Sequence, residues 1–293
     1  MWKLLQIELY KIARRPRTYI SFAAVAAIIF VVQIALKYDG KSYIGFMMSG
    51  LSDTFEFQND KVLNGYLVCF IILNTLLIHV PLLVALIAAD AIAGEANMGT
   101  LRLLVSKPIS RTQLMLVKFA ASVIYVIILL LWMALLALVV SIIIFGTNDM
   151  VVLRSDSFNQ MQADDVIWRY ILSFAYAAVA MSTVAALSLL LSVFAENSVG
   201  PIVATISIVI VLTILSEMNI PLYDKTVKPY LFTSHMVAWK GFFYVKASAD
   251  GETIKGSIEN LPAILKSFGI LMAYIIGFTG IAIISFRKKD ILS

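Results

Sequence analysis

The side chains of this chain that could do chemistry lie far apart in the sequence. The two histidines, His79 and His235, and the acidic pair Asp164-Asp165 belong to separate segments, and no recognisable motif surrounds any of them. Acid–base and nucleophilic sites need such groups within bonding distance of one another. No His/Cys cluster has metal-ligand spacing either. The sequence therefore predicts no catalytic residue, no metal site and no bound cofactor.

A phosphate-binding loop would be another source of chemistry. ATP-binding loops follow G-x-x-x-x-G-K-[ST], in which backbone amides and the lysine hold the phosphates. The chain contains Gly40-Lys41-Ser42, but position 35 is Ala35 instead of glycine. We interpret the triplet as a coincidence, so either another chain binds the ATP that drives this protein or the protein is not driven by ATP.

The elements that carry these residues are long and apolar. The chain has 293 residues, of which 61% are hydrophobic and 14% charged, and its mean hydropathy is +0.92. A soluble protein has about 25% charged residues. The net charge of +5 predicts no nucleic-acid partner, because the bases lie at the ends of apolar runs, where bases anchor spans to lipid headgroups. The single cysteine, Cys69, excludes a disulfide framework.

Six uncharged runs predict six membrane-spanning helices in one all-α domain over 1–293. About 20 helical residues cross a hydrocarbon core, and a backbone in lipid must satisfy its own hydrogen bonds. The first run is longer than a signal-peptide core and follows a patterned basic lead-in, so we expect a retained span. The expected spans are 18–36, 64–89, 119–145, 170–195, 198–216 and 267–286.

Basic flanks indicate the orientation of these spans. The RRPR run (14–17) precedes the first span, and RKK (287–289) follows the last. Bases close to span ends favour the cytoplasmic side. We therefore expect both termini in the cytoplasm of a cell, with the protein in a bacterial plasma membrane. The long segment 217–266 then lies outside, and its aromatic stretch 230–246 is expected at the outer membrane surface or dipping into it.

Residues 90–118, DAIAGEANMGTLRLLVSKPISRTQLMLVK, interrupt this apolar pattern between the second and third spans. They contain two acids, four bases, two glycines and a proline. Thr100 is a plausible N-cap for a short helix. Leu101, Leu104 and Val105 share one face of that helix because of their i, i+3, i+4 spacing.

A break and a second helix follow in the same segment. Pro108 ends the short helix, because the residue before a proline avoids helical geometry. Ser110 and Gln113 then form an S-x-x-Q capping box, which starts the helix that runs into the third span. The segment is therefore predicted to be a projecting loop with rigid helical parts and exposed charge.

The spacing of polar residues in this loop resembles that of a known family. Positions 90–118 fit D-x(3)-G-E-x(3)-G-T-x(3)-L-x(3)-P-x(2)-R-x(6)-K, through Asp90, Gly94, Glu95, Gly99, Thr100, Leu104, Pro108, Arg111 and Lys118. This pattern resembles the loop of ABC-2-type transporter permeases, the membrane subunits of ATP-driven exporters. The start ELYKIARRPRTY (8–19) and the turn ENSVGP (196–201) resemble that family as well, and the resemblance covers the whole six-span layout.

The resemblance implies a dimer of permeases, either identical or different, with two copies of a cytoplasmic ATPase subunit. It also implies that the loop carries a coupling helix that docks on the ATPase. Glu95, Arg102 and Arg111 are then expected to make polar contacts with the ATPase, while Gly99 and Thr100 shape the backbone. The alternative for the two arginines is that they anchor the loop to lipid headgroups.

An N-terminal helix is expected along the inner leaflet of the membrane. In WKLLQIELYKIA (2–13), Trp2 shares one helical face with Leu5, Leu9 and Ile12, which is typical of an interfacial helix. Glu8 and Lys11 form an i, i+3 pair, worth a few tenths of a kcal/mol, about 0.2–0.5. A contact of Glu8 with the ATPase is the alternative role.

Polar residues within the spans are few, and no span contains Asp, Glu, Lys or Arg. Ion-coupled carriers usually keep such a residue in the membrane, which argues mildly against a stand-alone carrier. Asn74 and His79 either line a pathway or serve packing, and His79 could bond the carbonyl freed by Pro81. We therefore predict a permease subunit driven by a separate ATPase, with a membrane enzyme (protease or acyl transferase) or a stand-alone secondary transporter as alternatives.

Overall fold

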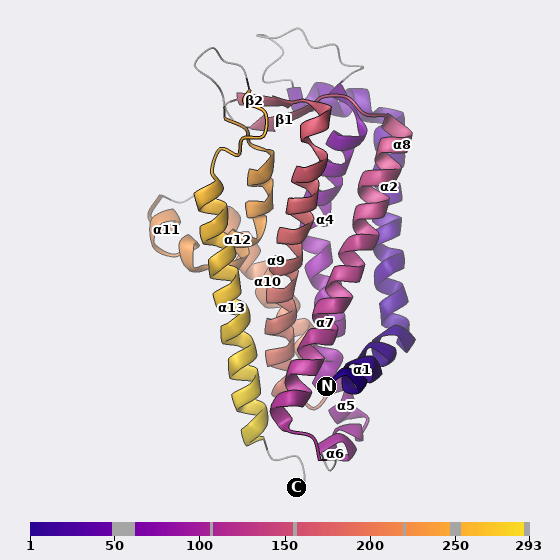
Figure 1. The fold of residues 1–293 in the computed structure, drawn as a ribbon, viewed down its shortest axis with the longest axis vertical. Helices are drawn as coiled ribbons and strands as arrows, with labels where there is room; N and C mark the ends of the chain where they lie inside the picture. The colour runs from indigo at the N-terminus through magenta and orange to yellow at the C-terminus, as the bar shows by residue number, and fades with distance from the viewer. Residues whose placement is uncertain (49–61, 106–107, 155–156, 219–220, 247–252, 290–293) are drawn as a thin grey trace.

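The computed structural model describes residues 1–48, 62–105, 108–154, 157–218, 221–246 and 253–289. Its long helices run side by side along one axis (Figure 1). The N-terminus and the end of the last helix lie at the same end of the bundle, which we call the terminal end. A short β-hairpin lies at the opposite end, which we call the hairpin end.

Six helices in the described residues are long and apolar enough to cross a membrane, so the predicted all-α membrane fold with six spans is confirmed. Helix α7 continues through a π-helical stretch, η1, into α8. The six are α2 (Pro16–Met48), α4 (Gly65–Ala88), α7 (Arg111–Ala134) with η1 (Leu135–Val140) and α8 (Ser141–Phe145), α9 (Ile167–Val193), α10 (Val199–Glu217) and α13 (Leu261–Lys288).

Several helices extend beyond the predicted spans. Helix α7, for example, begins at Arg111 instead of at position 119. Polar residues can continue a helix outside the lipid, so an apolar run marks the span and not the helix end. Gly40 lies inside α2, next to a break in helical geometry at Asp39 (φ −126°, ψ 19°), and not in a loop that precedes a helix.

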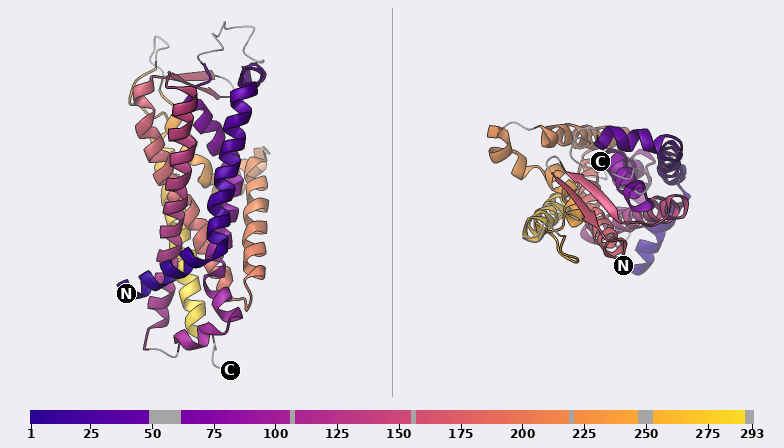
Figure 2. Two further views of the ribbon diagram at one scale, coloured as in Figure 1. Left: turned by 90° about the vertical axis from the view of Figure 1, so that its right-hand side faces the viewer. Right: turned by 90° about the horizontal axis from the view of Figure 1, so that it is seen from above.

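Three short helices surround the terminal end. They are α1 (Trp2–Arg14), α5 (Asp90–Asn97) and α6 (Thr100–Val105). Helix α5 continues α4 through Ala89, which itself has helical geometry (φ −68°, ψ −24°). Helix α1 packs across the side of α7 and carries the start of the chain away from the bundle axis (Figure 2). The expected N-terminal helix and the expected short helix after the second span are both present.

The hairpin end contains secondary structure that the sequence did not predict. Strands β1 (Met150–Arg154) and β2 (Ser157–Met161) pair antiparallel, with Met150 opposite Met161, and the short 3-10 helix η2 (Ala163–Asp165) follows. Each strand has five residues and pairs only with the other among the described elements. The sequence indicates only a polar connection between spans here, because neither strand is long enough to show a clear alternation of apolar and polar residues.

The aromatic stretch 230–246 packs into the bundle instead of covering it. It follows α11 (Pro221–Thr226), begins at the last residue of η3 (Lys228–Tyr230) and includes α12 (Phe232–Met236) and η4 (Val237–Phe243). Helix α12 lies beside α13, below the level of the hairpin (Figure 1). Phe232, Trp239 and Phe243 are buried in the main core. The stretch therefore packs among the spanning helices, and its expected position at or in the outer membrane surface stays a prediction.

A buried arginine fastens this stretch to α9. The Arg169 guanidinium has no exposed surface and pairs with the Asp165 carboxylate at 2.7 Å. It also donates to the carbonyls of Phe242 (2.6 Å) and Ser257 (2.7 Å). Asp164 pairs with Lys255. The acidic pair 164–165 therefore has structural partners, and no hydrogen bond or ion pair among the described residues joins it to either histidine.

Candidate functional site

The loop after the second span forms a compact turn at the terminal end. Gly99 has φ +71°, a left-handed conformation that favours glycine, and its N–H donates to the carbonyl of Ala96 at 3.0 Å. The Thr100 hydroxyl donates to the carbonyl of Glu95 at 3.3 Å, so this side chain supports the end of α5. The turn therefore sets the angle between α5 and α6, and Gly99 and Thr100 both belong to it.

The predicted start of α7 is also present. The Ser110 hydroxyl accepts a hydrogen bond from the N–H of Gln113 at 3.1 Å. This interaction satisfies one of the backbone donors that a helix start leaves unpaired. The short helix α6 ends at Val105, before Pro108.

Four charged side chains from α1, α5 and α7 meet at the terminal end, and we call them the basal ion cluster. The Lys118 ammonium lies 3.0 Å from Glu8 Oε2 and 2.9 Å from Glu95 Oε2, the latter as an ion pair without hydrogen-bond alignment. Lys11 Nζ lies 2.8 Å from Glu8 Oε1 and 2.7 Å from Glu95 Oε1. Each carboxylate thus contacts both ammonium groups.

The basal ion cluster is largely removed from solvent. The Lys118 side chain is 0% exposed, and those of Glu8 and Glu95 are 8% and 2% exposed. Lys118 also donates to the carbonyl of Ala91 at 2.8 Å, which joins α7 to α5 directly. Buried charges need partners of opposite sign, and here every charge has two. The cluster therefore fixes α1 and α5 on α7.

Ionisation of the cluster follows from these contacts. Burial alone would raise the pKa of the Glu8 carboxyl, but Lys118 and Lys11 outweigh burial and lower that pKa. Burial would lower the pKa of the Lys11 ammonium, but its bonds to Glu8 and Glu95 outweigh burial and raise it. Both shifts favour the charged forms, so the ion pair between Glu8 and Lys11 persists across neutral pH.

Asp90 forms a second junction at the start of α5. Its carboxylate accepts from Arg15 and from the hydroxyl of Ser198, and Arg17 Nη1 lies 3.0 Å from it. Gly94 lies one turn further along α5, where a Cβ atom would collide with this carboxylate. The aspartate therefore ties the starts of α2 and α10 to α5, and the glycine four residues later makes room for it.

Three residues for which a contact with the ATPase was considered interact within the chain instead. Glu95 and Glu8 are buried in the basal ion cluster, so neither carboxylate is placed for a direct polar contact with a partner. Arg111 Nη1 donates to carbonyls at the C-terminal end of α13, those of Phe286 (3.2 Å), Arg287 (3.0 Å) and Lys289 (2.6 Å). Arg102 is exposed on α6. Trp2 is 69% exposed at the start of α1.

A groove lies between α1 and the α5–α6 turn, and we call it the basal groove. Its volume is about 480 Å³. Met98 and Leu103 line it with side chains that are 61% and 67% exposed. The groove therefore combines apolar surface with several bases, and it is lined by Tyr10, Lys11, Arg14, Arg15, Pro16, Glu95, Met98, Thr100, Leu103 and Leu104.

The two predicted polar residues of the second span lie on α4, and each bonds to its own helix. Asn74 Nδ2 donates to the carbonyl of Phe70 at 2.9 Å. His79 Nδ1 bonds to the carbonyl of Thr75 at 2.9 Å, and not to the carbonyl freed by Pro81. Asn74 is half-buried and His79 is exposed.

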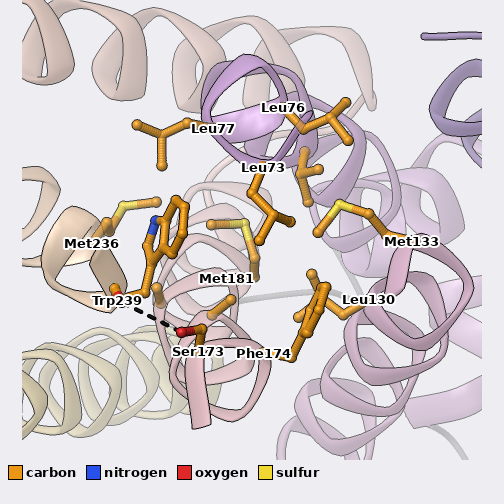
Figure 3. A pocket seen from close by; sticks show the side chains of 13 residues that line it. Leu73, Leu76, Leu77, Leu130, Met133, Ser173, Phe174, Met181, Met236 and Trp239 are labelled. Carbon is orange, nitrogen blue, oxygen red and sulfur yellow. Dashed lines mark hydrogen bonds between the residues drawn. The ribbon is translucent and has the colours of Figure 1, made fainter. Parts of the chain in front are cut away.

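A small apolar cavity lies inside the bundle, on the side of α4 that carries Leu73, Leu76 and Val80. Its volume is about 40 Å³, and α4, α7, α9, α12 and η4 enclose it. Figure 3 shows Met133, Met181 and Met236 pointing into this space, together with Trp239. The Ser173 hydroxyl donates to the Trp239 carbonyl at 3.4 Å, so its proton is already used in a bond within the protein. The lining offers packing surface and no group for catalysis.

A buried amide connects α2 to the π-helical stretch. Gln33 is 1% exposed, and its Nε2 donates to the Leu136 carbonyl and to the Ser141 hydroxyl, both at 2.9 Å. A π-helical turn shifts the backbone hydrogen-bond pattern, so a side chain that takes up a carbonyl there stabilises it. Gln33 thereby links the first and third spans inside the bundle.

Lys118, Asp90 and Gln33 are the organising residues that sequence reasoning did not select as site residues. Lys118 and Asp90 stand directly at the ends of uncharged runs, and both belong to the spaced pattern of the loop. A charged residue at the end of an apolar run could have indicated that its side chain is buried against the end of another helix. No signal in the sequence identifies which helix end supplies the partner.

Comparison with known proteins agrees with this arrangement. A family model described as ABC-2 family transporter protein matches residues 2–291, which is nearly the whole chain. None of the curated proteins compared with the chain matches it. With six spanning helices and a match over almost its full length, the chain belongs to the ABC-2 transporter family and is a multi-pass permease component that works with an ABC ATPase partner.

Proposed function

We propose that this permease forms the translocation pathway of an exporter as a dimer with a second permease subunit. Two copies of a separate ATP-binding subunit drive it by docking on the terminal end, which faces the cytoplasm. The protein resides in the plasma membrane of a bacterium, and the basic flanks at the terminal end support this orientation. This chain itself binds no ATP in the proposal.

The observation that carries the proposal is the rigid connection of the loop to the bundle. Through the basal ion cluster, α1, α5 and α7 share buried ion pairs, and α7 is the third span. A force applied to α5 or α6 therefore reaches a spanning helix directly. A partner that prefers one position of this unit can shift the bundle between two arrangements, because a ligand shifts an equilibrium only by its differential affinity.

The basal groove supplies the docking surface in this proposal. Exposed Met98 and Leu103 offer an apolar anchor, and Arg14 offers a positive charge beside them. Such a surface fits an apolar segment of the ATPase that carries an acidic residue. Interfaces of this kind depend on a few buried apolar anchors surrounded by polar contacts.

The test is co-purification of the nucleotide-binding subunit in mild detergent with variants of the groove. Leu103→Glu is expected to reduce the amount of bound ATPase at least tenfold. The matched control is Phe194→Glu, because Phe194 is 66% exposed at the same end but does not line the groove, whereas Leu103 is 67% exposed. The control is expected to retain the ATPase.

Equal recovery of the ATPase with both variants would remove the groove as the docking surface. A protein that purifies without any nucleotide-binding subunit, and whose activity ignores ATP, would favour the stand-alone carrier or the membrane enzyme. Replacement of His79 that abolishes turnover while assembly is intact would favour the enzyme.

A further inference from the structure

Helix α4 is most exposed at its middle. All of its residues are described, and its exposed side chains are those of Thr75, Ile78 and His79, whereas its other side chains are half-buried or buried. The helix packs against α2, α9 and α10, and the cavity residues occupy its opposite side. Residues spaced by three and four positions share one helical face, so these three side chains form one surface, which we call the α4 window.

The polarity of the α4 window differs from that of other exposed surfaces on the spans. Ile143, Ile276 and Leu131 are 76%, 68% and 64% exposed, and such apolar side chains suit contact with lipid. In the α4 window, two of three exposed side chains are polar, and one is an imidazole. His79 lies well inside the uncharged run 62–89. A polar ionisable side chain at that depth faces a water-containing cavity or a partner in preference to lipid.

The hydrogen bonds of Thr75 and His79 determine which donor and acceptor atoms the α4 window presents to a neighbouring molecule. The Thr75 carbonyl can only accept, so His79 Nδ1 carries the proton that it donates. In the neutral ring Nε2 is then an acceptor, and it has no partner among the described residues. The Thr75 hydroxyl donates its proton to the Ile71 carbonyl at 3.0 Å and keeps its lone pairs. The window therefore presents hydrogen-bond acceptors beside the apolar side chain of Ile78.

We propose that Thr75, Ile78 and His79 line the translocation pathway and bind the hydrogen-bond-donating group, such as an ammonium, of an amphipathic cargo. The apolar part of the cargo packs against Ile78, and its donor meets His79 Nε2. This inference rests on the proposed function, because the second permease subunit closes the other side of the pathway.

Accessibility can be tested by single-cysteine labelling in lipid nanodiscs. Cys69 is the one cysteine of the chain and has no exposed surface, so it gives a low background. His79→Cys is expected to react with a positively charged, water-soluble methanethiosulfonate at least tenfold faster than Ile276→Cys on α13. Both variants are treated in parallel with a lipid-soluble maleimide, which reports lipid-facing positions.

Two labelling results would overturn the inference. If His79→Cys reacts only with the lipid-soluble reagent, as Ile276→Cys should, the window faces lipid. If it resists both reagents and forms a disulfide with a second copy under oxidation, the window is a dry subunit contact. Neither readout involves ATP, so a failure of the proposed ATPase docking leaves this test valid.

The acceptor chemistry has its own test, in which His79 stays in place. Dodecylammonium and dodecyltrimethylammonium carry the same charge and chain, but only the first can donate a hydrogen bond. Dodecylammonium is expected to slow the labelling of Thr75→Cys severalfold more than its trimethyl analogue. His79→Leu should abolish that difference, and His79→Gln, which keeps an acceptor, should preserve part of it. Equal protection by both amphiphiles would overturn the donor-binding site.

Discussion

Lys118 Nζ lies 2.9 Å from the carboxylate of Glu95, although its side chain has no exposed surface. The ion pair joins the first residues of the third span to the helix that follows the second span. Glu8 from the N-terminal helix and Lys11 complete the basal ion cluster. The surface proposed to receive the ATPase is thus held in place by buried ion pairs.

Removal of the Lys118 charge should destabilise the terminal end. Lys118→Met leaves two buried carboxylates with only Lys11 as a counter-charge, and breaking a buried pair typically costs about 3–5 kcal/mol. The free energy of unfolding, measured by chemical denaturation in detergent, is expected to fall by that amount. Lys288→Met, an exposed lysine of the same end, is the control and should change it by less than about 0.5 kcal/mol.

A double-mutant cycle tests whether the loss is electrostatic. The double variant Lys118→Met with Glu95→Gln removes one charge of each sign and leaves Glu8 paired with Lys11. It is expected to be less destabilising than the sum of the two single variants, because neither of the removed charges leaves the other without its partner. If the losses of the two single variants simply add, the ion pair between Lys118 and Glu95 does not hold α5 on α7.

The attachment of α1 should depend on pH at both extremes. The Glu8 pKa is lowered in the folded protein from its usual 4.5, so its contribution is fully present above 4.5 and is lost as pH falls through the lower folded value. The Lys11 pKa is raised from its usual 10.5, so its contribution is present below 10.5 and is lost as pH rises through the higher folded value. Between these limits the contribution should be constant.

Amide hydrogen exchange of residues 2–14 measures this dependence, after correction for the intrinsic effect of pH on exchange. Protection is expected to decrease below pH 4.5, and Glu8→Gln should already show reduced protection at neutral pH with little further acid dependence. If the variant and the natural protein share one acid profile, Glu8 does not control the attachment of α1.

Gly99→Ala should be destabilising through the backbone alone. A Cβ at this position meets nothing within 4 Å, so the cost comes only from the φ of +71°. A left-handed conformation costs a non-glycine residue about 1–2 kcal/mol. Gly269→Ala is the matched control, because it also meets nothing within 4 Å but lies inside helix α13, where alanine is favoured. Thermal unfolding in detergent is the measurement. Gly99→Ala should unfold at a lower temperature than the natural protein, and Gly269→Ala should not.

Gln33 should contribute to the contact between the first and third spans. Gln33→Leu keeps the approximate size of the side chain but leaves the Leu136 carbonyl without its side-chain donor. Interhelical hydrogen bonds in membrane proteins average about 0.6 kcal/mol, with a maximum near 1.7. We expect a loss within that range, since the Leu136 carbonyl loses its side-chain donor. Ser141→Ala, which removes the other partner but leaves that carbonyl bonded, should cost less.

Features that depend on neighbouring residues in the chain could be predicted from the sequence. The apolar runs determine six spans because a hydrocarbon core demands about 20 apolar helical residues. Ser110 and Gln113 determine the start of α7, and Gly99 supplies the turn before α6. These features follow from local backbone chemistry, so no tertiary information was needed to find them.

Only the tertiary structure decided which charged residues meet. Lys11 and Glu95 are 84 positions apart, and Lys118 and Glu8 are 110 apart. The sequence shows that Glu95 and Arg111 are charged. It does not show that Glu95 is buried or that Arg111 donates to the carbonyls at the end of α13. The exposed side of α4 was equally undetermined, because Asn74, Thr75 and His79 are too few in a long apolar helix to predict which side stays open. Packing against neighbouring helices, among them α2, α9 and α10, decided that Thr75, Ile78 and His79 remain exposed.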